Sequence, residues 1–142
     1  MSEKAVKLYV DGSSLGNPGH GGCGYLIVDA KGNVIDEGAA YLGIVTNNEA
    51  EYRGLILGLK ALRKLGVKEV EILTDSRLLY MQLIGKYRVK AENLKPLHRE
   101  ARELLKGFRW NARWVQRDFN KRADQLAKRA ARGGIGNGEV HS

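Results

Sequence analysis

The sequence predicts an α/β fold in which helices pack on the faces of one mixed sheet. Three β-prone runs come first with only turns between them, as in an antiparallel meander. Helical and strand-like segments then alternate, and such helical crossovers connect parallel strands. We expect strands over residues 7–10, 22–29, 34–42, 69–74 and 109–115, and helices over residues 48–65, 76–84, 94–108 and 120–132.

The first three strands are predicted from short apolar runs bounded by turn residues. Residues 7–10 (KLYV) are β-prone, and we expect the glycine-rich segment after them to be a loop. The runs over residues 22–29 and 34–42 flank AKGN, a turn by composition. These two runs are therefore expected to form a hairpin.

The helix over residues 48–65 is predicted from apolar residues that recur at intervals of three and four. Tyr52, Leu55 and Leu59 fall on one face, and Gly66 follows in the usual C-terminal position. The alternating run EVEILT, residues 69–74, then reads as the fourth strand.

The second half of the chain is predicted in the same way. Pro96 falls in the first turn of the helix over residues 94–108, where its missing N–H is harmless. Trp110 and Trp114 alternate with polar residues in the last strand, and we expect both in the core. Asn120 is suited to cap the final helix.

The 142 residues fit one domain, expected to span residues 1–132, with the glycine-rich residues 133–142 as a flexible C-terminal tail. The one cysteine, Cys23, excludes an internal disulfide framework and fits a reducing compartment. The chain does not start with a signal peptide, and no apolar run is long enough to span a membrane. We therefore expect a cytoplasmic protein that does not contact a membrane.

Positive charge is concentrated in the second half of the chain. Residues 1–85 hold 9 Lys and Arg against 10 Asp and Glu, whereas residues 86–132 hold 15 against 5. A neutral half joined to a basic half suggests a polyanionic partner, most often nucleic acid. The alternative is a solvated basic surface that aids solubility.

Two aspartates follow strand-like runs in similar settings, Asp11 in YVDGSS and Asp75 in ILTDSR. Sites in α/β sheets form at the carboxyl ends of strands. If the two strands are parallel neighbours, the side chains lie about 4.8 Å apart, and such carboxylates favour a cation between them. Carboxylate oxygens are what Mg²⁺ accepts. The alternative is that each aspartate only forms a turn.

The segment TNNEAEY, residues 46–52, adds a third carboxylate. Glu49 and Glu51 are roughly 200° apart on a helix, so they cannot serve one site. Glu51 lies nearer the apolar face and is the candidate for a half-buried site beside the sheet. Glu49 is expected to interact with the helix dipole, while Asn47 and Asn48 can cap the helix or bind a ligand.

Asp124, in NKRADQLAK, is the fourth candidate acid. It lies one turn into the last helix, at the flank of the apolar face that carries Ala123. The alternative role is stabilisation of the helix N-terminus.

Taken together, these segments resemble ribonuclease H, type 1 branch, from about Lys7 to Ala130. YVDGSSLGNPGHGGCGY is similar to the pattern DGS-x-x-GNPG-x-GG-x-G of that family, and TNNEAE to TNN-x-x-E. LTDS and NKRADQLA match the third and fourth motifs. The resemblance implies a five-stranded mixed sheet, made of an antiparallel meander and two parallel strands, with helices on both faces.

The resemblance also implies a metal-dependent endonuclease that cuts the RNA strand of an RNA–DNA hybrid. The metal-binding and catalytic acids would be Asp11, Glu51, Asp75 and Asp124. Two Mg²⁺ ions, with Mn²⁺ as a substitute, would stabilise the attacking and leaving oxygens.

Substrate contacts are implied for further residues. Ribose 2′-hydroxyls, which distinguish RNA from DNA, would be read by Gly12, Ser13, Ser14, Asn17, Asn48 and Glu51. Asn47 would lie against the DNA strand and Thr46 would help to hold a DNA phosphate, with Arg77 beside the groove.

The sequence departs from larger bacterial members in two places. Residues 114–120 (WVQRDFN) lack the histidine that many members carry in this loop, and Asp118 in the matching place is a candidate auxiliary residue. The chain also lacks the insertion that forms a basic handle. Its expected replacement is GKYRVKAENLK, in which Lys86, Arg88 and Lys90 would contact phosphates.

Two alternatives to hybrid cleavage stay open. The same metal site would act on double-stranded RNA in one, and the fold would be a binding module without catalysis in the other. Four acids in four ordered motifs speak against the second. No feature suggests an obligate dimer, so we expect a monomer.

Overall fold

The computed structural model describes residues 5–136 and contains one five-stranded sheet in the order β3-β2-β1-β4-β5. The predicted mixed sheet is confirmed. Its strands are β1 (Val6–Leu15), β2 (Gly19–Val28), β3 (Val34–Val45), β4 (Glu69–Thr74) and β5 (Arg109–Trp114). The helical segments are α1 (Asn47–Lys64), α2 (Arg77–Leu83), α3 (Lys95–Leu105), the 3-10 helix η2 (Arg117–Asn120) and α4 (Lys121–Gly136).

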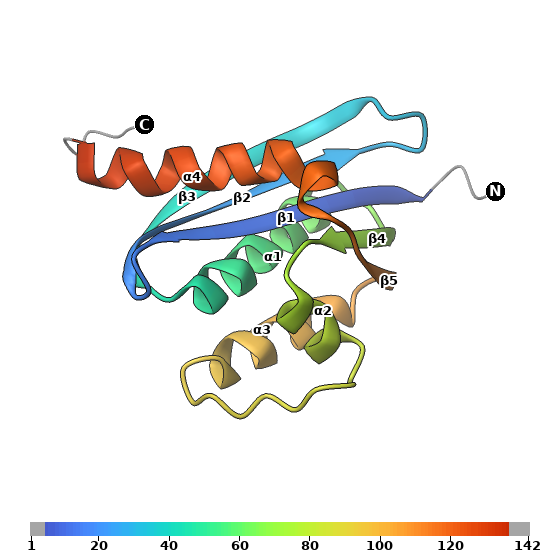
Figure 1. Ribbon diagram of the computed structural model, residues 1–142. Helices are drawn as coiled ribbons and strands as arrows, with labels where there is room; N and C mark the ends of the chain where they lie inside the picture. Colours follow the sequence, from blue (N-terminus) through green and yellow to red (C-terminus); the bar gives the residue numbers. More distant parts are fainter. Residues whose placement is uncertain (1–4, 137–142) are drawn as a thin grey trace.

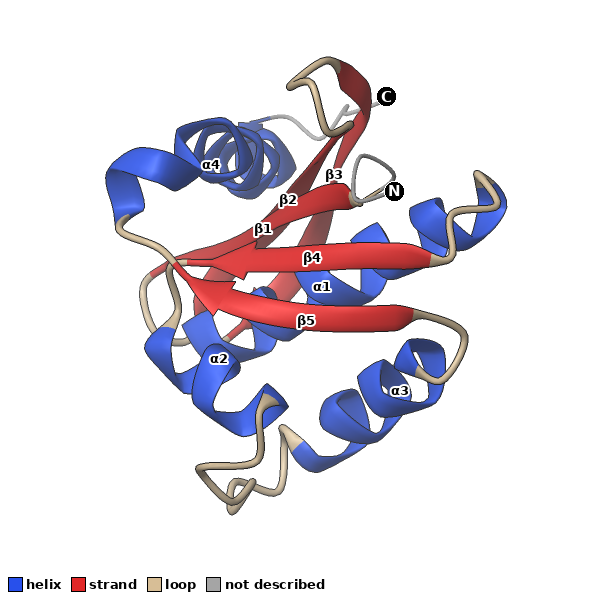
Figure 2. Ribbon diagram, turned by 90° about the vertical axis from the view of Figure 1, so that its right-hand side faces the viewer, coloured by secondary structure: helices blue, strands red, loops and turns tan. Residues whose placement is uncertain are grey.

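Strand β1 lies at the centre of the sheet and has a different kind of neighbour on each side. It pairs antiparallel with β2 and parallel with β4, and β4 pairs parallel with β5 (Figure 2). The last parallel pair of β1 and β4 joins Val10 to Thr74. The residues that follow, Asp11 and Asp75, therefore stand next to each other at the same edge of this ladder.

The expectation of a glycine-rich loop directly after Val10 is wrong. Strand β1 continues to Leu15, and β2 already begins at Gly19. The glycines of β2 let α4 pack directly on the strand. A Cβ atom at Gly22 would lie 2.4 Å from the backbone nitrogen of Ala131, and one at Gly24 would lie 2.9 Å from that of Ala127. Both glycines lie within the strand expected over residues 22–29, and they serve close packing, a requirement that composition does not reveal.

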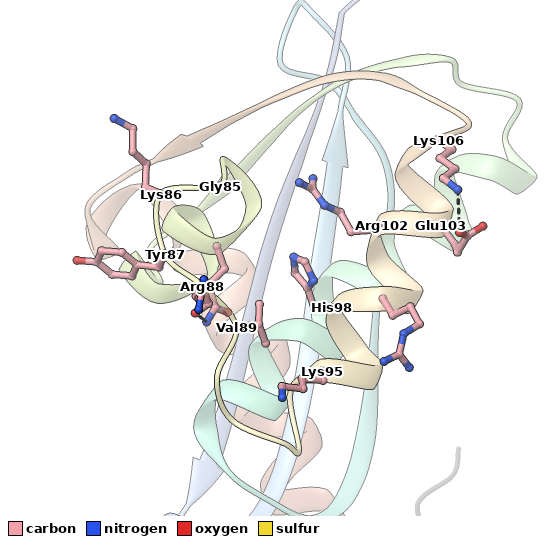
Figure 3. A pocket seen from close by; sticks show the side chains of 12 residues that line it. Gly85, Lys86, Tyr87, Arg88, Val89, Lys95, His98, Arg102, Glu103 and Lys106 are labelled. Carbon is pink, nitrogen blue, oxygen red and sulfur yellow. Dashed lines mark hydrogen bonds and ion pairs between the residues drawn. The ribbon is translucent and has the colours of Figure 1, made fainter.

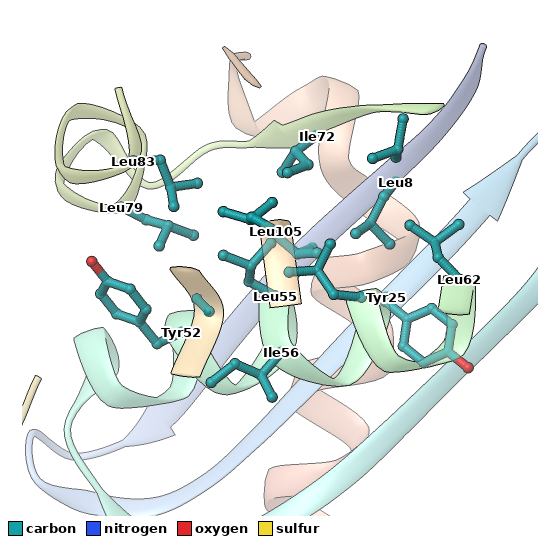
Figure 4. Packing of buried hydrophobic residues seen from close by; sticks show 14 of the residues in the cluster. Leu8, Tyr25, Tyr52, Leu55, Ile56, Leu62, Ile72, Leu79, Leu83 and Leu105 are labelled. Carbon is teal, nitrogen blue, oxygen red and sulfur yellow. The ribbon is translucent and has the colours of Figure 1, made fainter. Parts of the chain in front are cut away.

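Helices cover the two faces of the sheet unequally (Figures 1 and 2). α1 packs on one face against β1 and β2 and also contacts α2 and α3, while α4 lies on the other face over β1, β2 and β3. The main hydrophobic core lies between α1 and the sheet, where Leu8, Leu55 and Ile72 are fully buried (Figure 4). Leu105 of α3 closes the core beside them.

A buried polar connection links α1 to α2 at the edge of this core. The hydroxyl of Tyr52 donates a hydrogen bond of 2.6 Å to Oε1 of Gln82. The amide of Gln82 in turn donates to the carbonyl of Arg88, 3.3 Å away, in the loop that follows α2. The core helix that carries Glu51 is thus tied to the basic loop through one side chain.

Two further expectations differ from the structure. Helix α4 continues to Gly136, so residues 133–136 are helical and do not belong to a tail, and the rest of that expected tail lies outside the described residues. Trp110 packs against the core as expected, but Trp114 is 52% exposed. Strand β5 is the sheet edge, and exposure of its last residue follows from that position.

Within residues 5–136, every helix is too short or too polar to cross a membrane.

We predict that Gly22→Ala lowers the free energy of unfolding by about 1–3 kcal/mol, because the new methyl group would overpack the contact between β2 and α4. Urea unfolding followed by circular dichroism measures the change. Gly107→Ala is the matched control, since the nearest atom to a Cβ at Gly107 is 3.5 Å away. Equal stability of the two variants would contradict the packing role of Gly22.

Candidate metal centre

Three carboxylates from three separate elements meet at the end of the parallel strands. Asp11 of β1, Glu51 of α1 and Asp75 after β4 each offer one oxygen, and these oxygens all lie within 4.8 Å of one another. Asp11 is buried, and the other two side chains are half-buried. The predicted adjacency of Asp11 and Asp75 thus follows from the observed ladder, and Glu51 joins them from the helix.

Glu51 reaches Asp11 because α1 packs directly against the backbone of β1. A Cβ atom at Gly12 would lie 2.2 Å from the carbonyl carbon of Ala50 and 2.3 Å from the backbone nitrogen of Glu51. Only glycine fits such an approach. The N–H of Gly12 also donates a hydrogen bond of 3.2 Å to Oε1 of Glu51. Gly12 therefore sets both the distance between strand and helix and the orientation of the carboxylate.

The electrostatic environment favours protonation of this cluster in the absence of a cation. Burial, the charge of Asp75 and contact with Asp124 raise the pKa of Asp11 from 3.8 to about 8. Burial and the charges of Asp11 and Asp75 raise the pKa of Glu51 well above its usual range. Burial also raises the pKa of Asp75, although the Arg117 guanidinium acts in the opposite direction.

The donor set fits a hard divalent cation. All three groups offer carboxylate oxygens, which Mg²⁺ and Mn²⁺ accept, and the oxygens are close enough to share one ion. A divalent charge among them would reverse the effect of the mutual repulsion and hold the carboxylates ionised.

Asp124 lies beside the three acids, in the first turn of α4. Its charge acts to raise the pKa of both Asp11 and Asp75, so it lies near both. Its own carboxylate forms an ion pair of 3.2 Å with Lys128, one turn further along the helix. The fourth acid therefore borders the cluster and is partly neutralised by its own helix.

Three residues that sequence reasoning did not assign to the site hold Asp75 in place. The buried amide of Asn120 donates to the carbonyl of Val10, 2.9 Å away, and its side chain acts to lower the pKa of Asp75. The indole N–H of Trp114 donates to the carbonyl of Asp75 over 3.3 Å. The guanidinium of Arg117 lies 3.7 Å from the carboxylate. Asn120 is the last residue of η2, directly before α4. We expected its side chain to cap α4, but it bonds the backbone of β1 instead.

The start of α1 is capped by Thr46, which lies one residue earlier than the expected amide caps. Its hydroxyl accepts a hydrogen bond from the N–H of Glu49 over 3.1 Å, and the Glu49 carboxylate accepts one from the N–H of Thr46 over 2.7 Å. This is a capping box. Glu49 has the structural role expected of it, which leaves Glu51 as the acid that faces the sheet.

The segments expected to contact substrate converge around this helix start. Asn47 and Asn48 open α1 and are exposed. The N–H of Asn47 donates to Oδ1 of Asn17, 3.0 Å away in the turn after β1. The hydroxyl of Ser14 donates to the carbonyl of Val45 over 3.0 Å. The glycine-rich segment and the TNN segment therefore form one continuous polar surface next to Glu51.

The remaining expected substrate residues belong to α2 and the loop that follows it. Arg77 opens α2, and its guanidinium carbon lies 5.9 Å from the centre of the Trp114 ring. Lys86, Arg88 and Lys90 lie in the loop after α2, and all three are exposed.

Asp118 is exposed in η2 and lines a cavity with Tyr9, Val28 and Phe119 that contains none of the four acids. Its neighbour Arg117, and not Asp118, contacts Asp75.

Comparison with known proteins places this geometry in a family. The Reverse transcriptase-like family matches residues 9–130. The chain is 40% identical over 126 residues to Ribonuclease HI of Halobacterium salinarum and 42% identical over 127 residues to a bifunctional protein of Mycobacterium tuberculosis. Each match covers 88% of this chain, which spans 63% of the first protein and 35% of the second.

Solved structures agree with these matches. The Halobacterium salinarum enzyme superimposes with a TM-score of 0.86 over 89% of this chain and 96% of that chain. The N-terminal ribonuclease H domain of the Mycobacterium tuberculosis protein gives 0.90 at 40% identity, over 94% and 97%. A ribonuclease H1 recovered from compost, solved in complex with an RNA/DNA hybrid, gives 0.87 at 35% identity, over 92% and 99%.

We predict that the metal-free protein loses stability as pH rises from about 4 to about 8. Folded Asp11 and Glu51 keep protons that the unfolded chain releases, since their pKa values are raised. The native state therefore binds more protons, and the free energy of unfolding falls as pH increases. Urea unfolding in chelator at a series of pH values measures this slope.

Asp11→Asn should flatten that slope, and added Mg²⁺ should reduce it by binding the ionised carboxylates. Glu69→Gln, an exposed acid at the start of β4, is the control and should keep the wild-type slope. A wild-type slope in Asp11→Asn would contradict the raised pKa of Asp11.

Proposed function

Since this chain belongs to the ribonuclease H family, we propose that it is a metal-dependent endoribonuclease that hydrolyses the RNA strand of RNA–DNA hybrids. The observation that carries the proposal is the cluster of Asp11, Glu51 and Asp75 at the carboxyl ends of two parallel strands, with Asp124 beside it. Such a cluster is unfavourable without a cation, and it lies next to a polar helix start that can face a polyanion.

The four acids would hold two divalent cations, Mg²⁺ or Mn²⁺ as a substitute. When bound, these ions would activate the attacking water and stabilise the attacking and leaving oxygens of the phosphodiester.

The protein's own contribution is to hold the carboxylates in position before substrate arrives. The N–H of Gly12 orients Glu51, Asn120 fixes the backbone of β1 just before Asp11, and Trp114 fixes the backbone at Asp75. Lys128 holds the carboxylate of Asp124 on the same side of the helix. Positioning of this kind supports catalysis because little reorganisation is needed at the moment of reaction.

The polar surface around the start of α1 is suited to read the two strands of a hybrid. Gly12, Ser13, Ser14, Asn17, Asn48 and Glu51 would face the RNA strand, and Thr46 and Asn47 the DNA strand. The hydrogen bond from Asn47 to Asn17 supports a shared binding surface, because it fixes the two contact segments side by side. Arg77, Lys86, Arg88 and Lys90 would add phosphate contacts along the duplex.

Double-stranded RNA is the alternative substrate, and a hybrid-binding module without catalysis is the alternative function. The enzyme would act as a monomer in the cytoplasm, where the buried thiol of its one cysteine, Cys23, stays reduced.

We predict that the protein cuts the RNA strand of an RNA–DNA duplex in Mg²⁺ or Mn²⁺ and not in chelator, while Asp75→Asn abolishes turnover and still binds the hybrid. The mutation removes the charge of one metal ligand and leaves the basic surface intact. The assay compares end-labelled RNA–DNA, RNA–RNA and DNA–DNA duplexes, and a filter-binding measurement follows affinity.

Glu69→Gln serves as the matched control for loss of one acid on the same strand and should cut at the wild-type rate. Wild-type turnover in Asp75→Asn would contradict the four-acid site. Hybrid binding without cleavage in every lane would favour the binding module, and equal cutting of the RNA–RNA duplex would favour the broader substrate.

A further inference from the structure

Strand β5 carries two tryptophans, and an arginine lies over the ring of each. Trp110 packs against the hydrophobic core. The guanidinium carbon of Arg102, on α3 (Figure 3), lies 5.8 Å from the centre of its ring. Trp114 ends the same strand and is 52% exposed, and the guanidinium carbon of Arg77 lies 5.9 Å from the centre of its ring. Core packing therefore accounts for Trp110, whereas Trp114 needs another explanation.

The indole N–H of Trp114 contacts the residue that supplies a candidate metal ligand. It donates to the carbonyl of Asp75 over 3.3 Å. The N–H of Val115 donates to the preceding carbonyl, that of the fully buried Thr74, over 2.9 Å. The two peptide groups that flank the Cα atom of Asp75 are thus both bonded to consecutive residues at the end of β5. Because the orientation of these two peptide groups sets the direction of the Cα–Cβ bond, they also set where the Asp75 carboxylate points.

The ring of Trp114 holds a residue on the other side of the same turn. Arg77 opens α2 two residues after Asp75, and it is exposed. A guanidinium within about 6 Å of a ring centre is attracted by the π electrons, so the ring restrains a long side chain that would otherwise sample many rotamers. The start of α2 is also fixed, because the hydroxyl of Ser76 accepts a hydrogen bond from the N–H of Leu79 over 3.1 Å.

We propose that Trp114 is a positioning residue that places a metal ligand and a substrate contact relative to each other. Its N–H holds the backbone of Asp75 for metal binding, and its ring holds Arg77 for contact with the duplex. The inference rests on the proposed function, and it adds to that function a residue that touches neither the metal nor the substrate.

The two contacts belong to different parts of one side chain, so substitutions separate them. Trp114→Phe removes the N–H and keeps an aromatic face, whereas Trp114→Leu removes both. Arg77→Gln removes the cation alone. Trp110→Phe is the matched control, since it makes the same chemical change on the same strand, beside Arg102 in place of Arg77.

Isothermal titration calorimetry of the substrate-free proteins with Mn²⁺ tests the contact to the metal ligand. We expect Trp114→Phe and Trp114→Leu to bind Mn²⁺ about 3- to 10-fold more weakly than wild type, because one hydrogen bond behind a metal ligand is lost. Trp110→Phe should bind Mn²⁺ as wild type does. Wild-type Mn²⁺ affinity in Trp114→Phe, or an equal loss in Trp110→Phe, would overturn the inference.

Fluorescence anisotropy of a labelled RNA–DNA hybrid in chelator, where cleavage does not contribute, tests the contact to Arg77. We expect Trp114→Leu to bind the hybrid about 2- to 5-fold more weakly than wild type, because Arg77 must then be ordered on binding. Trp114→Phe should stay close to wild type. In an Arg77→Gln background, Trp114→Leu should cause no further loss. A loss of the same size in that background would overturn the role of the ring.

Cleavage of the hybrid in Mg²⁺ by the wild-type protein judges the proposed function separately. Absence of cleavage, together with the expected losses of affinity in the Trp114 variants, would contradict the enzyme and leave the positioning role standing. Cleavage by wild type, with both affinities unchanged in the Trp114 variants, would do the reverse.

Discussion

The parallel pairing of β1 with β4 is the interaction on which the candidate site depends. It ends at Val10 and Thr74, and the next residue of each strand is an aspartate. Helix α1 then has to approach β1 closely enough to add Glu51, which Gly12 permits by having no side chain. A shift of one residue in this ladder would turn one aspartate to the opposite face of the sheet. Register is therefore as important to the chemistry as the identity of the acids.

The distribution of charge follows from the same arrangement. The acids are gathered at the strand ends with only Arg117 and Lys128 as close cationic partners within the described residues, while α3 and the loop before it carry free cations. A polyanion would be repelled by the strand ends and attracted by the loop. Bound metal ions would remove that contrast, because they change the sign of the acidic region and leave the basic region unaltered.

Much of this architecture could be predicted from local patterns. The strand periodicity and the strand-end aspartates predicted the mixed sheet and the pairing of Asp11 with Asp75, and the helical period separated Glu51 from Glu49. The length of β1 could not be predicted, because Gly12 looks like a loop residue but is required by the close approach of α1, which comes later in the chain. Exposure of Trp114 was missed because alternation does not tell whether the end of an edge strand is covered.

Asn120 was seen in the sequence but assigned a local role, and its long-range bond has a consequence for how the protein is made. The amide joins the start of α4 to the carbonyl of Val10, across 110 positions of the chain. On a ribosome, β1 to β4 and α1 emerge before this partner does. Asp124, the fourth acid, and the Asn120 amide are synthesised only with the last helical segments. A nascent chain that has not yet reached Asn120 therefore carries an incomplete acidic centre.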